Sequence, residues 1–397
     1  MSEVILVVNA GSSSLKFQVH QVGDSGTLTF CLGGQVSGIS AEQPAFRAKD
    51  ANGQVLIEQT YEAHQVRDLA AAQDIMASWL ASQISRPPVA VGHRIVHGGP
   101  RMTHSVLITP DVLAYLDSLV PLAPLHQRNN LAPVHVIFEH WPEIRQVACF
   151  DTAFHRSQGP VVERFALPQE YYERGVRRYG FHGLSYQYLS GHLPTILPEV
   201  AKGRVIAAHL GSGASACAMV EGVSRETTMG FTALDGLPMA TRPGRLDAGV
   251  VLWMLEQGME HDEIQDLLYN RSGMKGLSGI SSDMRTLLAS DEPSARLAVD
   301  YFTYRAAESI AGLCVAAQGL DALVFTAGVG ENSPEIRAGI CRRLEWMGLR
   351  LDAAANAENR LTISSPESKI GVYVVATNEE QVIARQTAEV IFDRHSA

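Results

Sequence analysis

The chain has 397 residues, of which 46% are hydrophobic and 19% charged, a composition typical of folded globular proteins. This length exceeds what one hydrophobic core usually supports, so two domains are expected. The net charge of -10 at pH 7 argues against nucleic acid and membrane surfaces as partners, because both are anionic. The 34 glycines and 18 prolines are spread along the chain, which excludes collagen-like repeats and low-complexity disorder.

Two further features concern the compartment of the protein. No stretch reaches the roughly 18 consecutive apolar residues of a membrane-spanning helix, and the short apolar run at 4–8 lacks the basic residues that precede a signal sequence. The cysteines are odd in number and show no paired spacing, which is typical of reduced thiols: Cys31, Cys149, Cys217, Cys314 and Cys341. We therefore expect a cytoplasmic protein.

Short apolar runs, each followed by polar residues, predict a series of buried strands. In chain order they lie at 4–8, 89–91, 147–150, 205–208, 323–325 and 372–375. Helical patterns separate them, most clearly at 296–318, where Pro293 precedes the helix and Gly319 follows it. Strands that alternate with helices predict an α/β fold, with the strand ends presenting polar side chains to a cleft.

The beginning and the middle of the chain resemble one another. VILVVNAGSSSLKF at 4–17 and VIAAHLGSGASACA at 205–218 both run from an apolar strand through a polar residue and small residues into a second strand. Asn9 and His209 take equivalent places, 200 positions apart. An internal duplication and two unrelated hairpins both explain this pattern. Small residues at such turns let backbone N–H groups approach a phosphate, and the chain has no Walker loop that would do so instead.

The segment 90–99 contains the first candidate for ligand binding. Strand alternation would place Arg94 and Val96 on one face, with His93, Ile95 and His97 on the other. A guanidinium beside a small apolar side chain suits a carboxylate that carries a short alkyl group. An Arg94 that pairs structurally with a local acid is an equally open alternative, and His93 with His97 as metal ligands is a weaker one.

Three other residues lie where α/β proteins place their ligands. Asp151 follows a predicted strand, and suits metal or base chemistry as well as the capping of a helix. His182 lies between glycines and next to Phe181, which slightly favours a ligand-facing ring over a core histidine. Arg242 shares the loop 239–245 with a second arginine, and one of the two is expected to meet an anion.

Two glycine-containing segments, 276–285 and 327–335, are predicted to be loops that lead into helices. In the second, Ser333 as N-cap and Pro334 as first helical residue mark the start of the helix. Free N–H groups there would favour a phosphate or a purine ring. The segment TNEE at 377–380 ends the last predicted strand and brings a carboxylate to the cleft.

Together these segments resemble the acetate kinase family, within the superfamily of actin, sugar kinases and the Hsp70 ATPase. The resemblance covers essentially the full chain, in the order of the family, through NAGSSSLKF at 9–17, GHRIVHGG at 92–99, FDTAFH at 150–155, YGFHG at 179–183, HLGSGAS at 209–215, SDMR at 282–285, FTAGVGEN at 325–332 and TNEE at 377–380. It implies two duplicated ribonuclease-H-like domains, 1–150 plus 380–397 and 151–379, with an interdomain active-site cleft. It also implies a homodimer.

The activity that the resemblance implies is reversible phosphoryl transfer from Mg-ATP to acetate, giving acetyl phosphate and ADP, with Mn²⁺ as a substitute for Mg²⁺. Asp151, His182 and Arg242 would be catalytic, and Asn9 and Glu379 would hold the metal. The residues that would bind acetate are Arg94, Val96, Leu125, Phe181 and Ala233. Those that would bind ATP are Lys16, His209, Leu210, Gly211, Ser212, Gly213, Asp283, Met284, Arg285, Gly328, Val329, Gly330, Glu331 and Asn332.

Phosphoryl transfer to a carboxylate needs alignment and charge stabilisation more than a base. Asp151 is therefore expected to orient magnesium or a water molecule. The chain departs from the family pattern at Ala233, where a proline is expected, which leaves acyl-chain selectivity open. A propionate or butyrate kinase on the same scaffold is thus one alternative. An Hsp70-like protein that uses ATP as a conformational switch is an alternative of another class, and it would need a client-binding domain.

Overall fold

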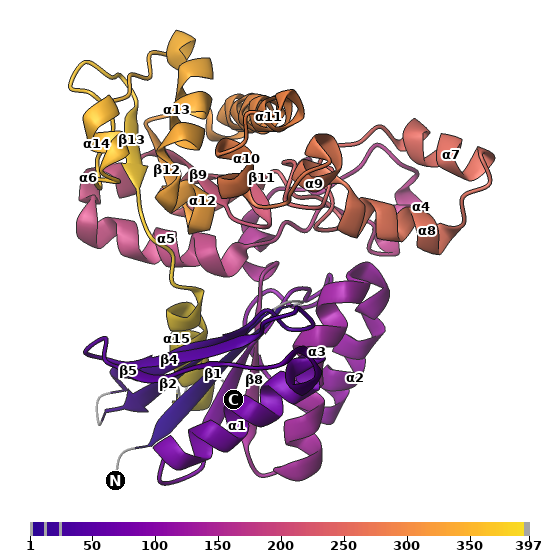
Figure 1. Ribbon diagram of the computed structural model, residues 1–397, viewed down its shortest axis with the longest axis vertical. Coiled ribbons are helices and arrows are strands. Elements are labelled where there is room, and N and C mark those ends of the chain that lie inside the picture. The colour runs from indigo at the N-terminus through magenta and orange to yellow at the C-terminus, as the bar shows by residue number, and fades with distance from the viewer. Residues whose placement is uncertain (1–2, 12–13, 24–25, 393–397) are drawn as a thin grey trace. The chain divides into compact units, whose positions relative to one another are not determined.

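The computed structural model describes residues 3–11, 14–23 and 26–392, and the chain forms two compact units that are considered separately below (Figure 1). The first unit consists of Met1–Ala153 and Asn378–Ala397, and the second of Phe154–Thr377. Asp151 and Glu379, which the sequence assigned to the second domain, thus belong to the first unit. Asp151 is held there because its N–H donates to the Ile95 carbonyl at 3.0 Å. Glu379 begins a helix that packs on the sheet of this unit.

In the first unit the strand order is β5-β4-β3-β2-β1-β6-β8-β7. Its strands are β1 (Val4–Ala10), β2 (Ser14–Val22), β3 (Leu28–Ser37), β4 (Ala45–Asp50), β5 (Val55–Thr60), β6 (Ala90–Ile95), β7 (Val106–Leu107) and β8 (Arg145–Phe150). Its α-helices are α1 (Leu69–Gln83), α2 (Pro110–Ser118), α3 (Pro124–His140) and α15 (Glu379–Phe392).

In the second unit the strand order is β11-β10-β9-β12-β13. The strands are β9 (Arg204–Leu210), β10 (Ala214–Val220), β11 (Val223–Thr227), β12 (Ala322–Thr326) and β13 (Gly371–Val374). The α-helices are α4 (Gln169–Glu173), α5 (Gly183–Ile196), α6 (Pro198–Ala201), α7 (Ala248–Glu256), α8 (His261–Asp266), α9 (Gly273–Ser278), α10 (Met284–Leu288), α11 (Pro293–Ala317), α12 (Ala327–Asn332), α13 (Pro334–Arg343) and α14 (Ala353–Ala357).

The two sheets repeat one topology. In each, the first strand pairs antiparallel with the second, as β1 does with β2 and β9 with β10. The first strand also pairs parallel with a later strand, β6 or β12, which in turn pairs parallel with β8 or β13. The predicted α/β fold is confirmed, and the repeated order favours an internal duplication over two unrelated hairpins.

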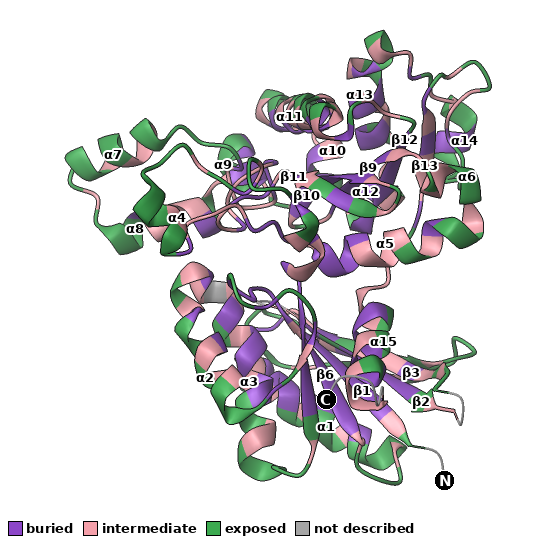
Figure 2. Ribbon diagram, turned by 180° about the vertical axis from the view of Figure 1, so that it is seen from behind, coloured by how far each residue is buried: buried purple, intermediate pink, exposed green. Residues whose placement is uncertain are grey.

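Helices cover both faces of the first sheet. One face, with Leu6 and Val8 of β1, packs on Met76 and Leu80 of α1. Figure 2 shows β1 and β6 buried. The opposite face packs on α15, which approaches β6 closely because Gly92 has no side chain. A Cβ on Gly92 would lie 2.1 Å from Oγ1 of Thr387. Such overpacking typically costs about 1 to 3 kcal/mol, so glycine is what allows α15 to begin beside the end of β6.

One part of the core of the second unit lies between α5 and its sheet. Tyr186, Leu189 and Leu193 of α5 pack with Val205 and Cys217 of the strands. Helix α11 contacts the same sheet, and its Pro293–Ala317 range confirms the helix predicted at 296–318. It begins earlier than predicted because Pro293 occupies its first turn, where a missing N–H costs nothing.

One predicted loop is wrong. Residues 327–332 form helix α12, because the carboxylate of Glu331 accepts a hydrogen bond from the Ala327 N–H at 2.8 Å and so caps the turn from within. The start of the next helix is confirmed, with Ser333 as N-cap and Pro334 in the first turn. In the segment 276–285, helix α9 covers the first residues, and Asp283 caps α10 by accepting from the Arg285 N–H.

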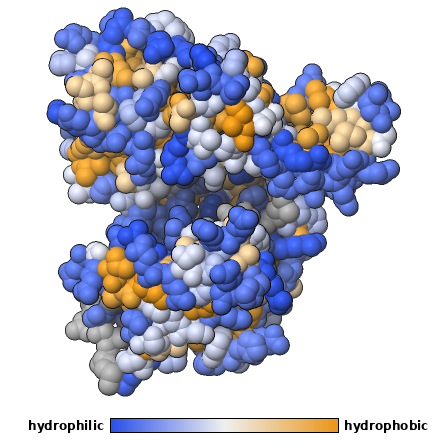
Figure 3. Space-filling view, in the orientation of Figure 1, coloured by the Kyte–Doolittle hydropathy of each residue, from blue (hydrophilic) through white to orange (hydrophobic). Residues whose placement is uncertain are grey.

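Several large apolar side chains are exposed in the second unit. Three of them lie on α7, where Leu252, Trp253 and Leu255 are 60%, 57% and 48% exposed, and orange surface marks this helix in Figure 3. Within the described ranges, no helix combines the length and apolarity that crossing a bilayer requires. The five cysteines are free thiols, and burial raises the pKa of Cys149, Cys217 and Cys341 to about 12.

Candidate functional site

In the first unit, four predicted site residues meet at the strand ends that face α15. The guanidinium of Arg94 binds Asp151 through two hydrogen bonds, from Nε to Oδ1 at 3.0 Å and from Nη2 to Oδ2 at 2.7 Å. Its Nη1 donates to Oδ1 of Asn9 at 3.3 Å. Oε2 of Glu379 lies 3.8 Å from Nε of Arg94. Asn9, Arg94, Asp151 and Glu379 therefore form one polar group, which together with Glu380 we call the Arg94 group.

Strand alternation explains this meeting. On β1, Leu6 and Val8 point to the α1 face, so Asn9 points to the α15 face. Arg94 shares a face of β6 with Gly92, whose missing side chain makes room for α15. Asp151 continues β8 by one residue, and Cys149, two residues earlier, also contacts α15. Each side chain is thus directed by the period of its own strand.

Glu380 is a member of the Arg94 group that sequence reasoning missed. Its Oε1 accepts a hydrogen bond from Nδ2 of Asn9 at 2.9 Å. The prediction that Asn9 and Glu379 hold the metal did not name Glu380. The motif TNEE offers two adjacent glutamates, and the helix that begins at Glu379 decides which one reaches Asn9. No signal in the sequence separates them.

The Arg94 group carries an excess of negative charge. Asp151, Glu379 and Glu380 contribute three formal negative charges against one positive charge from Arg94. Burial alone would lower the pKa of Arg94, but the nearby carboxylates raise it above its ordinary value, so this arginine is always charged. Asp151 is 1% exposed and depends on Arg94 for its charge balance.

The oxygen atoms of the Arg94 group suit Mg²⁺ better than they suit an ion that is held entirely by protein side chains. Across the described parts of the chain, no three His, Cys, Asp or Glu side chains are grouped so that they could hold an ion. Mg²⁺ usually takes only one or two carboxylates and completes its shell with water and substrate phosphates. His93 and His97 do not form a metal pair: His93 is buried, its Nε2 lies 2.8 Å from Oε1 of Gln146, and burial lowers its pKa to about 4.

The other predicted residues of this unit have separate surroundings. Lys16 is exposed and lies directly across from Asn9 in the β1–β2 pair. Strand β6 ends at Ile95, so its alternation does not extend to Val96 as predicted. Instead, the Val96 N–H donates to Oδ1 of Asn130, and Asn130 also donates to the Ala10 carbonyl at 2.6 Å. The side chain of Leu125 lies outside the described residues, as do Ser12 and Ser13 of the first hairpin.

In the second unit, His182 and His209 stack at the glycine loop 211–213. Their ring centroids are 4.2 Å apart and the planes differ by 20°. Each Nδ1 lies 2.8 Å from a serine hydroxyl, Ser215 for His182 and Ser185 for His209. His182 has a left-handed backbone, with φ of 56°, which is uncommon outside glycine and frequent at functional sites.

Arg242 reaches the same loop. A Cβ on Gly213 would lie 2.9 Å from Nη2 of Arg242 and 3.2 Å from Nε2 of His182. The Arg242 Nη1 donates to the Ala233 carbonyl at 2.8 Å, which couples two predicted site residues. The Ala240 N–H donates to the Ser212 carbonyl at 3.1 Å. This unit therefore gathers a guanidinium and an imidazole at the loop 211–213, and these two groups together suit an anion.

The acyl-pocket residues of the second unit are buried. Phe181 is 1% exposed and Ala233 is 7% exposed. The Phe181 carbonyl lies 3.0 Å from Nε2 of His155, a buried ring that the sequence analysis did not single out. A carbonyl only accepts, so His155 donates from Nε2 and helps to hold the turn that carries His182.

The residues predicted to bind the nucleotide differ in exposure. Arg285 is exposed and pairs with Asp283 at 2.6 Å, and hydrogen bonding to Arg285 lowers the pKa of Asp283. Gly328 and Asn332 are exposed, with the Asn332 amide bonded to the Gly328 carbonyl. Ser212 is exposed as well. Buried or half-buried are His209, Leu210, Gly211, Gly213, Met284, Val329, Gly330 and Glu331. Glu331 also accepts from the Thr377 N–H at 3.2 Å, so its carboxylate ties α12 to the end of the last strand.

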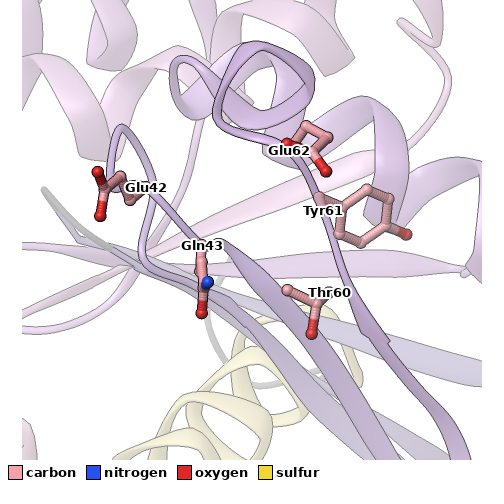
Figure 4. A pocket seen from close by; sticks show the side chains of 5 residues that line it. All are labelled: Glu42, Gln43, Thr60, Tyr61 and Glu62. Atoms are coloured by element: carbon pink, nitrogen blue, oxygen red, sulfur yellow. The ribbon is translucent and has the colours of Figure 1, made fainter.

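A separate pocket lies in the first unit beside β5. It has a volume of about 300 Å³ and is lined by Glu42, Gln43, Thr60, Tyr61 and Glu62. In Figure 4 these side chains point in different directions and do not converge on a common point. No residue of the Arg94 group lines it, so we assign it no part in the site.

Comparisons with known proteins agree with the family that the sequence motifs resemble. The sequence model of the Acetokinase family matches residues 4–385. The chain is 52% identical to an acetate kinase of Nitrobacter hamburgensis, over 99% of this chain and 97% of the relative. It is 50% identical to an acetate kinase of Rhizobium meliloti, over 98% of each chain.

Solved structures give the same result. A crystal structure of Porphyromonas gingivalis acetate kinase is 36% identical with a TM-score of 0.83, over 98% of this chain and 100% of that one. A propionate kinase from Francisella tularensis is 34% identical with a TM-score of 0.88, over the same shares. The coverage is nearly complete in each case, and the chain therefore belongs to the acetokinase family.

Proposed function

We propose that this chain transfers a phosphoryl group reversibly between Mg-ATP and acetate, giving ADP and acetyl phosphate. Family membership supports a kinase that acts on a carboxylate. The observation in the structure that carries the proposal is the fork of Arg94, which already binds a carboxylate, Asp151, through two hydrogen bonds. Acetate offers the same two accepting oxygens on a smaller group, so the Arg94 guanidinium can donate to it in the same way.

Asp151 would keep Arg94 oriented rather than act as a base. A carboxylate nucleophile carries no proton that must be removed, and Asp151 is committed to the guanidinium. When acetate binds, one nitrogen of the fork would turn from Asp151 to the substrate, leaving the attacking oxygen only partly neutralised. This arrangement holds the reactant in line without quenching its nucleophilicity.

Magnesium would be held by Glu379 and the amide oxygen of Asn9, and when bound it would neutralise charge on the ATP phosphates. Glu380 orients the Asn9 side chain by accepting from its Nδ2. The coordinating atom would be Oδ1, which in this structure accepts from Nη1 of Arg94. Lys16, opposite Asn9 on β2, would contact the polyphosphate.

Charge on the transferred group would be stabilised by Arg242, His182 and the N–H groups of the loop 211–213. Donors aimed at the equatorial phosphoryl oxygens lower the barrier more than they tighten substrate binding. The segments 283–285 and 328–332 would surround the adenosine, with Glu331 holding α12 in place.

The test is ADP release from Mg-ATP with acetate, propionate, butyrate, glycerol or no acceptor. We expect the highest kcat/KM with acetate, a lower value with propionate and a poor rate with butyrate, while glycerol matches the background. A hydrophobic pocket discriminates one methylene by only about 1 to 3 kcal/mol, so propionate should remain a real substrate. Equal ADP release without any acceptor would contradict the proposal and favour an ATP-driven switch.

Replacing Ala233 by proline should narrow the acyl specificity. Proline adds ring carbons at the proposed pocket wall and retains the carbonyl that binds Arg242, so transfer to acetate should be preserved. We expect the ratio of kcat/KM for acetate over propionate to rise by about 10-fold or more, the effect of roughly one methylene. An unchanged ratio would remove Ala233 from the pocket.

Replacing Glu379 by glutamine should raise the Mg²⁺ concentration needed for half-maximal rate by about 10-fold or more, since changes around a bound metal typically cost that much affinity. The matched control is Glu380→Gln, which removes the same charge from the Arg94 group and keeps an oxygen to accept from Asn9. We expect a smaller shift for it. Equal shifts would mean that total charge, rather than coordination by Glu379, sets the metal dependence.

We further propose that the protein is a cytoplasmic homodimer that accepts Mn²⁺ in place of Mg²⁺. The family resemblance supports the dimer and the metal range. The unpaired cysteines support a reducing compartment. Light scattering gives the molar mass that tests the dimer.

A further inference from the structure

A buried chain of hydroxyl groups leads to the ring of His182. Nδ1 of His182 lies 2.8 Å from Oγ of Ser215, and this Oγ lies 2.5 Å from the phenol oxygen of Tyr186. Tyr186 and Ser215 are both 0% exposed. Tyr186 lies one turn after His182 in α5, and its N–H donates to the His182 carbonyl at 3.1 Å, so the helix itself places the phenol beneath the ring.

The direction of this chain follows from its two ends. Within the described parts of the chain, the phenol oxygen of Tyr186 is buried and has Oγ of Ser215 as its hydrogen-bonding partner. A buried phenol proton needs an acceptor, so this proton is directed to Oγ of Ser215. Ser215 accepts that proton and has its own hydroxyl proton left to donate, which goes to Nδ1 of His182. The opposite direction would require another buried acceptor for the phenol proton, and buried donors without acceptors are rare.

This direction decides where His182 carries its proton. A neutral imidazole has one donor and one acceptor nitrogen, so an accepting Nδ1 puts the proton on Nε2. Nε2 is the atom that faces Gly213, beside Nη2 of Arg242. The stacked ring of His209 is tied in the same manner, through Ser185 to Thr377 at 2.9 Å, and it keeps the plane of His182 fixed.

We propose that Tyr186 and Ser215 are positioning residues that hold His182 as the Nε2–H tautomer, so that it donates a hydrogen bond at the loop 211–213. The proposal rests on the proposed function, in which that loop holds the phosphate under transfer. Tyr186 and Ser215 touch no substrate themselves. They act by removing the alternative in which the proton sits on Nδ1 and Nε2 could only accept, which would repel a phosphoryl oxygen.

The direct test is ¹⁵N NMR of the full chain labelled at histidine, with the His182 signals assigned by their loss in His182→Gln. We expect the wild type to show a protonated Nε2 and an unprotonated Nδ1, with widely separated shifts. In Tyr186→Phe the serine can also accept from the ring, so the separation should shrink. The matched control, Tyr188→Phe, lies in the same helix against His192 and should leave both signals in place.

Kinetics give the second readout. Tyr186→Phe and Ser215→Ala should each lower kcat by about 10-fold, with KM for acetate and ATP within about twofold, because donation to the phosphoryl group is lost while substrate binding is kept. Tyr188→Phe should be as active as the wild type. A wild-type His182 protonated on Nδ1 would overturn the inference, as would a Tyr186→Phe variant with unchanged shifts and kcat. The ¹⁵N shifts of the wild type can be measured whether or not the protein is an active kinase. The tautomer of His182 and the proposed function are therefore tested independently.

Discussion

Arg94→Ala is expected to lower kcat/KM for acetate by about 10²- to 10³-fold, the usual effect of losing one charge-assisted contact in the transition state. The same change should also destabilise the fold. Asp151 is 1% exposed and would be left as a buried carboxylate without its partner, which typically costs about 3 to 5 kcal/mol. A loss of activity in Arg94→Ala alone would therefore not separate the lost contact to acetate from the destabilised fold.

The double variant Arg94→Ala/Asp151→Asn separates them. Removing the orphaned charge should restore most of the lost stability, measured by urea unfolding, while activity stays low because no guanidinium is left to hold acetate. Arg94→Lys, which keeps the charge but not the fork, should retain the fold and still lose much of kcat/KM. Recovery of activity in the double variant would show that Arg94 serves only to neutralise Asp151.

Arg242→Ala should lower kcat by about 10²- to 10³-fold with a much smaller effect on stability. Its Nη1 bonds to a backbone carbonyl, that of Ala233, and the guanidinium is half-buried at the loop 211–213. The chain offers a matched control three residues away, because Arg245 is exposed in the same loop. We expect Arg245→Ala to change kcat by less than about twofold, as surface substitutions usually do little.

The comparison of the two arginines decides between local chemistry and net charge. Both variants remove one positive charge from the loop, so a general electrostatic role would lower kcat in both. If Arg245→Ala were as damaging as Arg242→Ala, the assignment of Arg242 to the phosphoryl group would be wrong. Turnover of both variants at saturating Mg-ATP is the measurement that distinguishes these results.

Much of the fold could be predicted because its signals are local. An apolar run that ends in a polar residue marks a buried strand, and the run before Asn9 became β1. A proline in the first turn marks a helix start, as at Pro293 and Pro334. Each of these signals needs only a few neighbouring residues. The prediction of a loop at 327–332 failed for another reason. The glycines there suggested a loop, whereas the carboxylate of Glu331 caps its own helix.

The sequence alone also determined which side chains are candidates for chemistry, because strand ends and glycine loops place polar residues where ligands bind. It could not decide their partners. Asn9 and Glu380 are 371 positions apart, and their contact exists because Gly92 lets α15 pack closely on β6. Likewise, the proton on His182 depends on Tyr186 in a helix and Ser215 in a strand. Such partnerships are set by packing between distant elements, and local patterns carry no record of them.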